Sequence, residues 1–340
     1  MTTNREVRFG ILGAAAIAPA ALVVPARTVA GATVAAVAAR DPSRAQAFAS
    51  RHGIGRVHRS YQDLLDDESI DAVYNPLPNG LHGHWTLRAL AAGKHVLCEK
   101  PFAANADEAA EVAAAAEASG LVVMEAFHWR YHPLTARLLA IVGSGELGEL
   151  RHVEGSLCFP LVKTHDIRYD PALAGGALMD VGCYAVNFVR TVVGLEPTVE
   201  RATLAMTRRG VDRFASAHLS FPGGTTGTVV SSLWSHHLLT MHIRVTGSTG
   251  ELRVFNPMRP KFGGSITVRG ADGVRRREKP WPQSTYACQL EAFMAAVLDG
   301  MPFPSTAEDA VRNMAVIDAI YRAGGHEPLR PTRVPDGATG

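Results

Sequence analysis

The chain has 340 residues, of which 47% are apolar and 19% charged, enough for two domains with separate hydrophobic cores. Its 34 basic and 32 acidic side chains are dispersed along the sequence and give a formal net charge of +2. This pattern argues against a polybasic surface, so we expect neither nucleic acid nor a membrane as a partner.

The sequence also bears on compartment. No uninterrupted apolar run approaches the roughly 20 residues of a membrane-spanning helix, and the first residues lead into a strand-like segment instead of a signal peptide. The four cysteines are widely separated and form no C-x-x-C pair, which argues against a disulfide framework and against a thiolate zinc site. We therefore expect a cytoplasmic protein with reduced thiols.

The first 126 residues alternate short apolar runs with alanine-rich segments of helical character. The expected strands are residues 8–13, 33–39, 71–77, 95–99 and 121–126. Near-continuous apolar strands separated by helices are typical of a parallel sheet that is buried on both faces. The sequence thus predicts an α/β Rossmann domain, a doubly wound parallel sheet over residues 1–126.

The pattern changes after about residue 150. A helical segment at 178–193 precedes several strand candidates, among them 215–221, in which apolar and polar residues alternate. Helices are expected again near 286–298 and 307–321. We expect a C-terminal α+β domain over residues 127–330, with a large open antiparallel sheet, and then a loosely held tail over residues 331–340.

A tight turn follows the first expected strand, in the segment GAAAIA at residues 13–18. In dinucleotide-binding folds this turn aims helix N-terminal amides at the pyrophosphate, but here G-x-A-x-x-A replaces the usual G-x-G-x-x-G. A plain strand-to-helix turn is the structural alternative. The cofactor-binding candidates in this segment are Gly13, Ala14, Ala15 and Ile17.

The tip of the second expected strand indicates which dinucleotide binds. An NAD enzyme holds an acid there for the ribose 2'-hydroxyl, whereas this chain has Ala39 followed by Arg40. A guanidinium can grip a 2'-phosphate, and so Arg40 favours NADP over NAD. The alternative is that Arg40 is solvated and that Asp41 serves the ribose of NAD.

Two further strand ends carry polar residues toward the expected ligand crevice. Pro78 and Asn79 follow the strand at 71–77, where Asn79 could cap the next helix or help to form a wall for the nicotinamide. The apolar strand 95–99 ends in Glu99 and Lys100, next to Pro101. A charged pair at the end of a buried strand costs desolvation unless it is used or paired, and a structural salt bridge is the alternative.

Four motifs in order resemble the glucose-fructose oxidoreductase / inositol dehydrogenase / MocA (Gfo/Idh/MocA) family. They are the G-x-x-x-I-A turn from Gly13, PNGLH from Pro78 to His82, EKP from Glu99, and GGALMDVGCY from Gly175 to Tyr184. The resemblance extends over essentially the whole chain.

The resemblance implies a nicotinamide-dependent oxidoreductase that acts on a sugar, polyol or vicinal diol. It implies that Pro78, Asn79, His82, Glu99 and Lys100 lie at the cofactor. It also implies that Lys100 reaches the reacting hydroxyl or carbonyl, next to a Lys-Pro bond that is often cis. It also implies a homodimer or higher homo-oligomer that forms through the C-terminal sheet.

One departure from the family pattern narrows the resemblance. Many sugar dehydrogenases of the family read D-x-G-x-H, whereas this chain has Tyr184 in place of the histidine. Such a tyrosine is similar to that of dimeric dihydrodiol dehydrogenases, NADP-linked xylose dehydrogenases and certain nucleotide-sugar ketoreductases. In the first two groups Trp129 and Arg130 would flank the nicotinamide, and Tyr286 resembles a residue of the same branch.

Hydride transfer at a carbinol carbon requires a proton to leave or join the oxygen. A phenol ordinarily titrates near 10, and an adjacent ammonium lowers that value, so Tyr184 is the expected proton carrier and Lys100 the group that tunes it. The reverse assignment stays open. Asp180 lies four residues before Tyr184 and is expected on the same helix face, where it could reach substrate hydroxyls or cap the helix.

The remaining candidates concern substrate and metal. Asp166 and Arg168 lie in a polar loop where they could contact sugar hydroxyls, and specificity is expected in the loops 159–174 and 235–240. Histidine pairs occur at 82/84, 128/132 and 236/237, but none has a third ligand at a convincing spacing, and we expect no metal.

Two other functions remain open. One is a ketoreductase that acts on a nucleotide-linked deoxysugar, against which a pocket too small for a nucleotide would argue. The other is a dinucleotide-sensing protein without catalysis, against which the presence of Lys100 and Tyr184 argues. The sequence does not name the substrate or the direction of the reaction.

Overall fold

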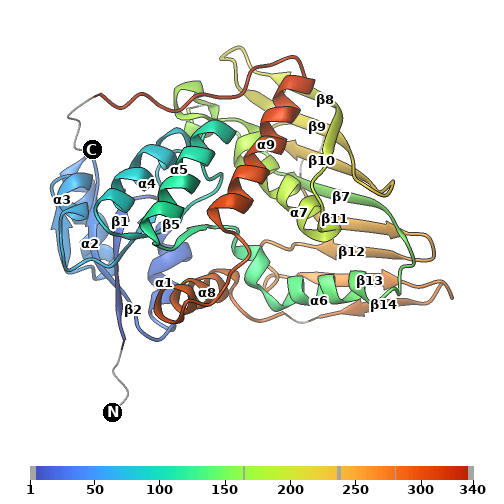
Figure 1. The fold of residues 1–340 in the computed structure, drawn as a ribbon, viewed down its shortest axis with the longest axis horizontal. Helices are drawn as coiled ribbons and strands as arrows, with labels where there is room; N and C mark the ends of the chain where they lie inside the picture. The colour runs from blue at the N-terminus through green and yellow to red at the C-terminus, as the bar shows by residue number, and fades with distance from the viewer. Residues whose placement is uncertain (1–4, 164, 236–238, 280, 336–340) are drawn as a thin grey trace. The chain divides into compact units, whose positions relative to one another are not determined.

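The computed structural model describes residues 5–163, 165–235, 239–279 and 281–335 (Figure 1). The chain forms two compact units. The first comprises Met1–His128, Tyr286–Val311 and Pro331–Gly340, and the second comprises Trp129–Thr285 and Arg312–Arg330. We describe each unit by itself.

The first unit is an α/β unit with a six-stranded sheet. Its helices and strands are β1 (Val7–Leu12), η1 (Pro19–Val23), α1 (Val24–Ala26), β2 (Ala32–Ala38), α2 (Pro42–His52), β3 (Arg56–His58), α3 (Tyr61–Leu65), β4 (Ala72–Asn75), η2 (Asn79–Leu81), α4 (His82–Ala91), β5 (His95–Cys98), α5 (Ala106–Ser119), β6 (Val123–Glu125) and α8 (Thr285–Asp299).

The strand order of this sheet is β3-β2-β1-β4-β5-β6, and every pairing is parallel. This confirms the predicted doubly wound fold. The order reverses between β1 and β4, and ligands of such sheets bind outside the carboxyl ends of the strands at that point. Strand β3 was not predicted, because its three residues are only partly buried and have no apolar run.

Helix α8 belongs to the first unit, although the sequence analysis grouped its residues with the C-terminal domain. Phe293 of α8 lies against Phe9 of β1, with ring centroids 5.6 Å apart, and both side chains are fully buried. Helical periodicity identifies this helix but not the core on which its apolar side packs.

The second unit is built on an eight-stranded sheet. Its elements are η3 (His128–Tyr131), α6 (Pro133–Gly143), β7 (Leu150–Cys158), η4 (Ile167–Tyr169), η5 (Pro171–Leu173), η6 (Leu178–Gly182), α7 (Cys183–Val193), β8 (Thr198–Met206), β9 (Asp212–Ser220), β10 (Thr226–Ser232), β11 (Thr240–Gly247), β12 (Glu251–Phe255), β13 (Ser265–Arg269) and β14 (Arg275–Glu278). Helix α9 (Ala307–Ala323) continues into it from the first unit.

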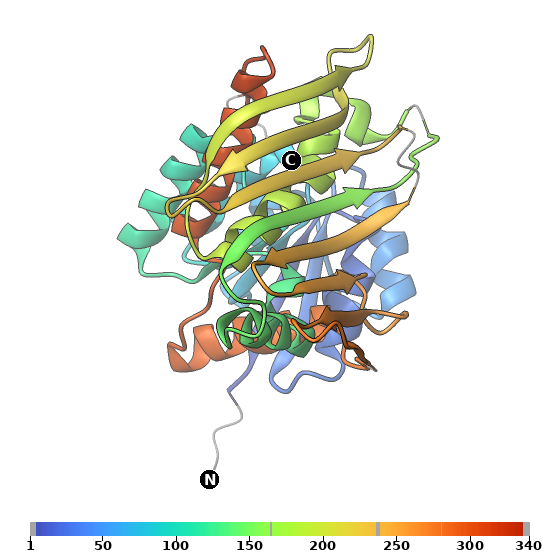
Figure 2. The ribbon, with the colours of Figure 1, turned by 90° about the vertical axis from the view of Figure 1, so that its right-hand side faces the viewer.

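The strand order of the second sheet is β14-β13-β12-β11-β7-β10-β9-β8 (Figure 2). The predicted antiparallel arrangement is confirmed for all neighbours except one, since β7 and β10 run parallel. The connection between them contains α7 and the β8–β9 hairpin. It is therefore long enough to return the chain to the sheet in the same direction.

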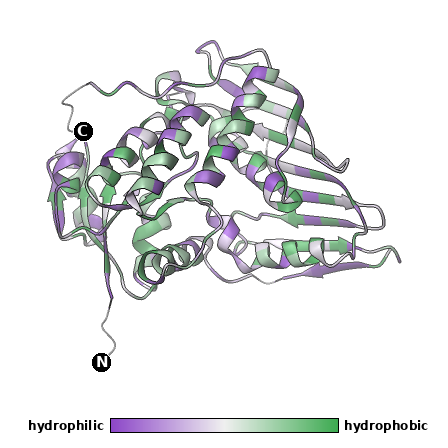
Figure 3. Ribbon diagram, in the orientation of Figure 1, coloured by the Kyte–Doolittle hydropathy of each residue, from purple (hydrophilic) through white to green (hydrophobic). Residues whose placement is uncertain are grey.

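The two faces of this sheet differ in polarity. Ala215, Ala217 and Leu219 of β9 are buried, whereas the open face carries polar side chains such as Glu154 and His242, whose Oε1 and Nε2 atoms lie 2.8 Å apart. Figure 3 shows hydrophobic and hydrophilic residues mixed along these strands. The apolar residues of the alternating strands thus lie on the buried face of the sheet and belong to the core of the unit.

Residues 171–193 form the one segment of the described chain that is long and apolar enough to span a membrane by length and composition, although Asp180 and Arg190 interrupt it. An 18-residue window of this segment has a mean hydropathy of 1.4, which by length and composition would suffice to cross a membrane. However, 89% of that window is buried in the folded protein. We therefore interpret it as a core helix of the second unit.

Candidate active site

The turn after β1 has the geometry that a dinucleotide requires. Gly13 has a φ of +97°, a value that side-chain-bearing residues rarely adopt, and a Cβ there would approach Leu77 Cδ2 to 3.1 Å. Residues 14–17 are partly or fully exposed, and η1 begins at Pro19. The residues of this turn therefore fit a pyrophosphate held against the backbone.

Arg40 and Asp41, which follow β2, have different environments. The Asp41 carboxylate caps α2, where its Oδ1 accepts hydrogen bonds from Ser43 N at 2.9 Å and from Ser43 Oγ at 2.6 Å. These bonds lower the pKa of Asp41. Because the Asp41 carboxylate serves the helix and Arg40 is exposed, the arrangement favours Arg40 as the residue that meets the ribose end of the cofactor.

Asn79 is not the helix cap that the sequence analysis considered. It lies inside the turn η2, and Leu81 occupies the N-cap position of α4. The chain makes an extra helical turn after Pro78, which the proline-rich sequence did not reveal.

His82 connects two of the strand-end turns. Its Nε2 lies 2.6 Å from Leu77 O and its Nδ1 lies 2.7 Å from Pro101 O, and the ring is almost fully buried. Burial lowers the pKa of His82 to about 4, although both carbonyls act in the opposite direction. Both ring nitrogens contact the protein, so the geometry favours a positioning role for His82 next to Lys100.

The two charged residues at the end of β5, Glu99 and Lys100, differ in their exposure to solvent. Glu99 is buried, and its Oε1 accepts a hydrogen bond from Tyr74 Oη at 2.8 Å. Lys100 follows it, is partly exposed, and precedes the cis peptide bond to Pro101. The tyrosine contact satisfies one carboxylate oxygen, which reduces the cost of burying Glu99.

Asp180 and Tyr184 lie on the long core helix of the second unit, but not simply one turn apart. Residues Leu178–Gly182 form a π-helix, η6, before α7 begins at Cys183. A π-helix has i→i+5 hydrogen bonds and wider turns than an α-helix, so the four-residue spacing does not by itself place the two side chains on one face. Short π-helical segments are frequent at functional sites.

Arg168 holds the Asp180 carboxylate from the loop before this helix. Its Nε donates to Asp180 Oδ2 at 2.7 Å, and its Nη1 donates to Asp166 Oδ1 at 3.0 Å. Asp180, more than Asp166, raises the pKa of Arg168. The structure thus brings together three of the predicted substrate residues in one ion-paired cluster of the second unit.

A pair that the sequence analysis missed supports the start of the same helix. Asp212 is almost fully buried on β9, and its Oδ2 accepts a hydrogen bond from Leu178 N at 2.7 Å. Its Oδ1 accepts another from Tyr321 Oη at 2.7 Å. A lone aspartate at the start of an apolar strand was the only signal in the sequence.

The other predicted residues lie in distinct surroundings. Trp129 is fully buried in the second unit, where its Nε1 donates to Asn187 Oδ1 at 3.0 Å, and Arg130 is partly exposed. In the first unit, the rings of Tyr286 and His128 pack at a tilt of 37°, with centroids 4.1 Å apart. The packing of Trp129 gives it a structural role. A contact with the nicotinamide, as the sequence analysis expects, would be a second role.

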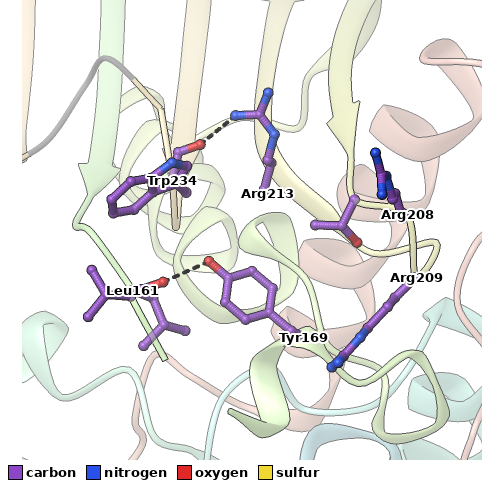
Figure 4. A pocket seen from close by; sticks show the side chains of 8 residues that line it. Leu161, Tyr169, Arg208, Arg209, Arg213 and Trp234 are labelled. Carbon is purple, nitrogen blue, oxygen red and sulfur yellow. Dashed lines mark hydrogen bonds between the residues drawn. The ribbon is translucent and has the colours of Figure 1, made fainter. Parts of the chain in front are cut away.

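A pocket of about 410 Å³ lies in the second unit (Figure 4). Its walls come from the loop after β7, from the β8–β9 turn and from the end of β10. The lining residues are Leu161, Val162, Tyr169, Thr207, Arg208, Arg209, Arg213 and Trp234.

Within the described parts of the chain, no three His, Cys, Asp or Glu side chains come together as a metal site would require. The pair His236/His237 lies outside the described residues.

Comparison with known proteins agrees with the geometry. The parallel sheet, the glycine turn and the charged strand ends define a dinucleotide-binding oxidoreductase. Residues 7–127 match the Gfo/Idh/MocA family model described as an oxidoreductase family with an NAD-binding Rossmann fold, and residues 135–253 match the model of the GFO/IDH/MocA C-terminal domain. The chain therefore belongs to the Gfo/Idh/MocA family of oxidoreductases, as the motifs predicted.

Two similar proteins cover nearly the full length. The D-xylose 1-dehydrogenase (NADP(+)) 2 of Haloferax volcanii is 42% identical over 319 residues, which are 93% of this chain and 96% of that protein. The dTDP-3,4-didehydro-2,6-dideoxy-alpha-D-glucose 3-reductase of Actinomadura kijaniata is 33% identical over 334 residues, 96% and 97% of the two chains.

Two further similarities complete the comparison. The trans-1,2-dihydrobenzene-1,2-diol dehydrogenase of Sus scrofa is 36% identical over 225 residues, 66% of each chain. The crystal structure of a 3-ketoreductase from Actinomadura kijaniata in complex with NADP and TDP-benzene matches with a TM-score of 0.87 and 31% identity, over 94% of this chain and 98% of that one.

Proposed function

We propose that this oxidoreductase uses NADP to oxidise one carbinol of a sugar, polyol or vicinal diol. The observation that carries the proposal is the held carboxylate of Asp180, fixed by Arg168 on the helix that also carries Tyr184. A fixed carboxylate and a phenol are suited to accept hydrogen bonds from neighbouring hydroxyls and to move a proton. The xylose and dihydrodiol dehydrogenases among the relatives act on such substrates by name.

The proton chemistry is assigned to Tyr184 and Lys100. Bound NADP⁺ would supply the hydride acceptor for the carbinol carbon. Tyr184 takes the proton of the hydroxyl oxygen, and the Lys100 ammonium lowers the cost of the phenolate form. Structures of the A. kijaniata 3-ketoreductase include one variant with a lysine replaced and one with a tyrosine replaced, and these positions are as far apart in sequence as Lys100 and Tyr184.

The cofactor assignment rests on the tip of β2. Arg40 is exposed, and Asp41 is engaged at the N-terminus of α2, so a 2'-phosphate meets a guanidinium and no uncommitted carboxylate. The NADP specificity named for the Haloferax enzyme and the NADP in the Actinomadura structure support the same assignment. Gly13, Ala14, Ala15 and Ile17 would hold the pyrophosphate.

A substrate screen tests the proposal. Aldoses including xylose, inositols and trans-dihydrodiols are each offered with NADP⁺, and reduction is followed by nicotinamide absorbance; the same screen with NAD⁺ compares Michaelis constants. We expect turnover with at least one neutral substrate and a lower Michaelis constant for NADP⁺. Tight NADP⁺ binding without turnover of any carbinol would contradict the proposal and would favour a dinucleotide-sensing protein.

The second candidate function is reduction of a nucleotide-linked keto sugar. Its specific support is the pocket of about 410 Å³, a volume within the usual range for organic ligands. Such an enzyme would consume NADPH with a nucleotide-linked ketone and would be inactive with the free sugar.

Assembly and compartment complete the proposal. The chain forms a homodimer through its eight-stranded sheet and acts in the cytoplasm, where its four cysteines, free in the structure, stay reduced. The polar open face of the sheet would make such an interface rich in hydrogen bonds. Light scattering with size-exclusion chromatography measures the assembly, and a monomer at micromolar concentration would contradict it.

A further inference from the structure

A second pocket of the second unit lies on the open face of its eight-stranded sheet. It has a volume of about 220 Å³ and is formed by β11, β12, β13 and β14, which lie side by side at one edge of the sheet (Figure 2). Its lining residues are Arg244, Glu251, Leu252, Arg253, Thr267, Arg269 and Arg275. We refer to it as the arginine pocket, because four guanidiniums and one carboxylate give it a formal charge of +3.

The strand register places these charges directly opposite one another. Arg244 of β11 pairs with Arg253 of β12, and Arg269 of β13 pairs with Arg275 of β14. The Cβ atoms of such pairs lie about 4.5–5.5 Å apart, and like charges in these positions destabilise a sheet. Glu251 is opposite Arg269 and offsets only one of the four charges. The register therefore costs stability, which a bound anion would restore.

A neighbouring residue of β14 shows how an arginine of this unit is otherwise accommodated. Arg276 lies on the other face of the sheet by strand alternation, and its Nη2 donates to Glu146 Oε2 at 2.7 Å. Its Nε also donates to Glu278 Oε1 at 3.4 Å. By contrast, the four guanidiniums of the arginine pocket make no hydrogen bond or ion pair with any residue that the structure describes. Their N–H groups are therefore available to a ligand.

One more carboxylate on this face is already engaged. Glu154 of β7 is opposite Arg244, but its Oε1 lies 2.8 Å from His242 Nε2. The imidazole, more than Arg244, lowers the pKa of Glu154. This carboxylate is thus shared with a second cationic partner and does not neutralise the cluster.

We infer that the arginine pocket is a binding site for a small polyvalent oxyanion, such as phosphate or the phosphoryl group of a phosphate ester. The planar fork of arginine matches two phosphate oxygens, and a charge of about −2 balances the cluster better than the single charge of chloride or a carboxylate. Thr267, opposite Arg253, adds a hydroxyl donor. The volume of about 220 Å³ lies below the usual range for drug-sized ligands, which favours a small anion.

The inference goes beyond the proposed oxidoreductase chemistry and does not depend on it. None of the residues that line the arginine pocket is among the cofactor or substrate residues assigned above. The pocket lies, however, on the face through which the proposed dimer would form. A test must therefore report binding whether or not a second copy covers this face.

Thermal unfolding of the protein saturated with NADP⁺ meets this requirement, because a ligand of the folded state raises the unfolding midpoint in any state of assembly. Saturation also occupies the phosphate sites of the cofactor. The probes are phosphate, methyl phosphate and acetate at matched ionic strength. We expect phosphate at about twenty times its dissociation constant to raise the midpoint by roughly 2–5 °C, and acetate to leave it unchanged. A larger rise with methyl phosphate would also support the site and would identify a phosphate ester as the ligand.

A cross-strand double variant locates the binding. Arg244→Gln with Arg253→Gln should weaken phosphate binding in calorimetry roughly 10- to 100-fold and remove most of the phosphate-dependent rise. In chloride of low ionic strength, the same variant should unfold at an equal or higher temperature than the wild type, because it removes a pair of like charges. This opposite sign separates loss of a ligand site from damage to the sheet.

Arg201→Gln is the matched control. Arg201 is an exposed arginine of β8, opposite the exposed His218 on the same face of the sheet and outside the pocket. Phosphate excluded from protein surfaces stabilises folded proteins in general, and this effect should be equal in the control and the wild type. The control should therefore keep the full phosphate response.

Three results would overturn the inference. They are an equal rise with acetate, an equal phosphate response in the wild type and the double variant, and an equal loss in the double variant and the control. Turnover of a carbinol without a phosphate response would refute the site and leave the proposed function standing. A phosphate response that the double variant loses, without turnover of any carbinol, would do the reverse.

Discussion

Replacement of Asp212 by asparagine tests how the helix with Asp180 and Tyr184 is held. The buried Asp212 carboxylate accepts hydrogen bonds from Leu178 N and Tyr321 Oη, which favour its ionised form. Burial opposes them more strongly and raises the pKa of Asp212 from 3.8 to about 6. The folded protein therefore holds this proton more tightly than the unfolded chain does.

The sign of the pH dependence follows from linkage. As pH rises from about 4 to about 6, the unfolded chain loses the Asp212 proton first, so the free energy of unfolding falls; above about pH 6 both states are ionised and the contribution is constant. The full change is about 3 kcal/mol, at 1.36 kcal/mol per pKa unit, and about 2 kcal/mol of it falls between about pH 4.5 and pH 7.5. Asparagine does not titrate.

Urea unfolding followed by circular dichroism measures this difference. The wild-type protein should lose about 2 kcal/mol relative to Asp212→Asn between about pH 4.5 and pH 7.5. Asp272→Asn is the control, since Asp272 accepts a hydrogen bond from Val274 N at 2.9 Å in an exposed turn. A wild-type advantage over Asp212→Asn that stays constant across this range would refute the reasoning.

Three further substitutions probe the cofactor and substrate residues. Gly13→Ala places a side chain at φ +97° and should cost about 1–2 kcal/mol in stability and weaken NADP⁺ binding in calorimetry; unchanged affinity would contradict the assigned turn. Arg40→Ala should raise the Michaelis constant for NADP⁺ roughly 10- to 100-fold and leave that for NAD⁺ unchanged, and equal effects on both would remove Arg40 from the 2'-phosphate. Arg168→Gln releases Asp180 and should lower kcat/KM for the substrate roughly 10- to 100-fold without altering NADP⁺ affinity, whereas unaltered kcat/KM would exclude Asp180 from substrate binding.

The first unit could be predicted well because its signals are local. Its buried strands are continuous apolar runs, and the turn at Gly13 and the acid-base pair at Glu99 and Lys100 follow directly from the strand ends. Strand β3 was not predicted, because its three half-exposed residues do not form a continuous apolar run.

The second unit was predicted in its type but not in its details. Alternation identifies a half-buried strand without naming its neighbour, so the parallel pairing of β7 with β10 could not be read from it. The π-helix at Leu178–Gly182 could not be distinguished from an α-helix in the sequence, since its residues would equally suit either. The contact of Asp212 with Tyr321 joins residues 109 positions apart, and no local pattern encodes it.

The pocket of Figure 4 also could not be predicted, because its residues come from segments far apart in the sequence. The loop 159–174 was expected to set specificity, and it does supply Leu161 and Tyr169 to the pocket. Arg208 and Arg213, from a hairpin some 40 residues later, carried no signal of a shared site. Their convergence is a property of the strand order and not of any single segment.

The central claim is that Tyr184 carries the proton and that Lys100 tunes it. The most direct measurement is the pH profile of turnover for Tyr184→Phe and Lys100→Met, with NADP⁺ dissociation constants measured alongside. The account predicts that Tyr184→Phe lowers kcat by roughly 100-fold or more at every pH, and that Lys100→Met shifts the rise of activity to higher pH, while both bind NADP⁺ normally. Near-normal turnover by Tyr184→Phe would contradict it.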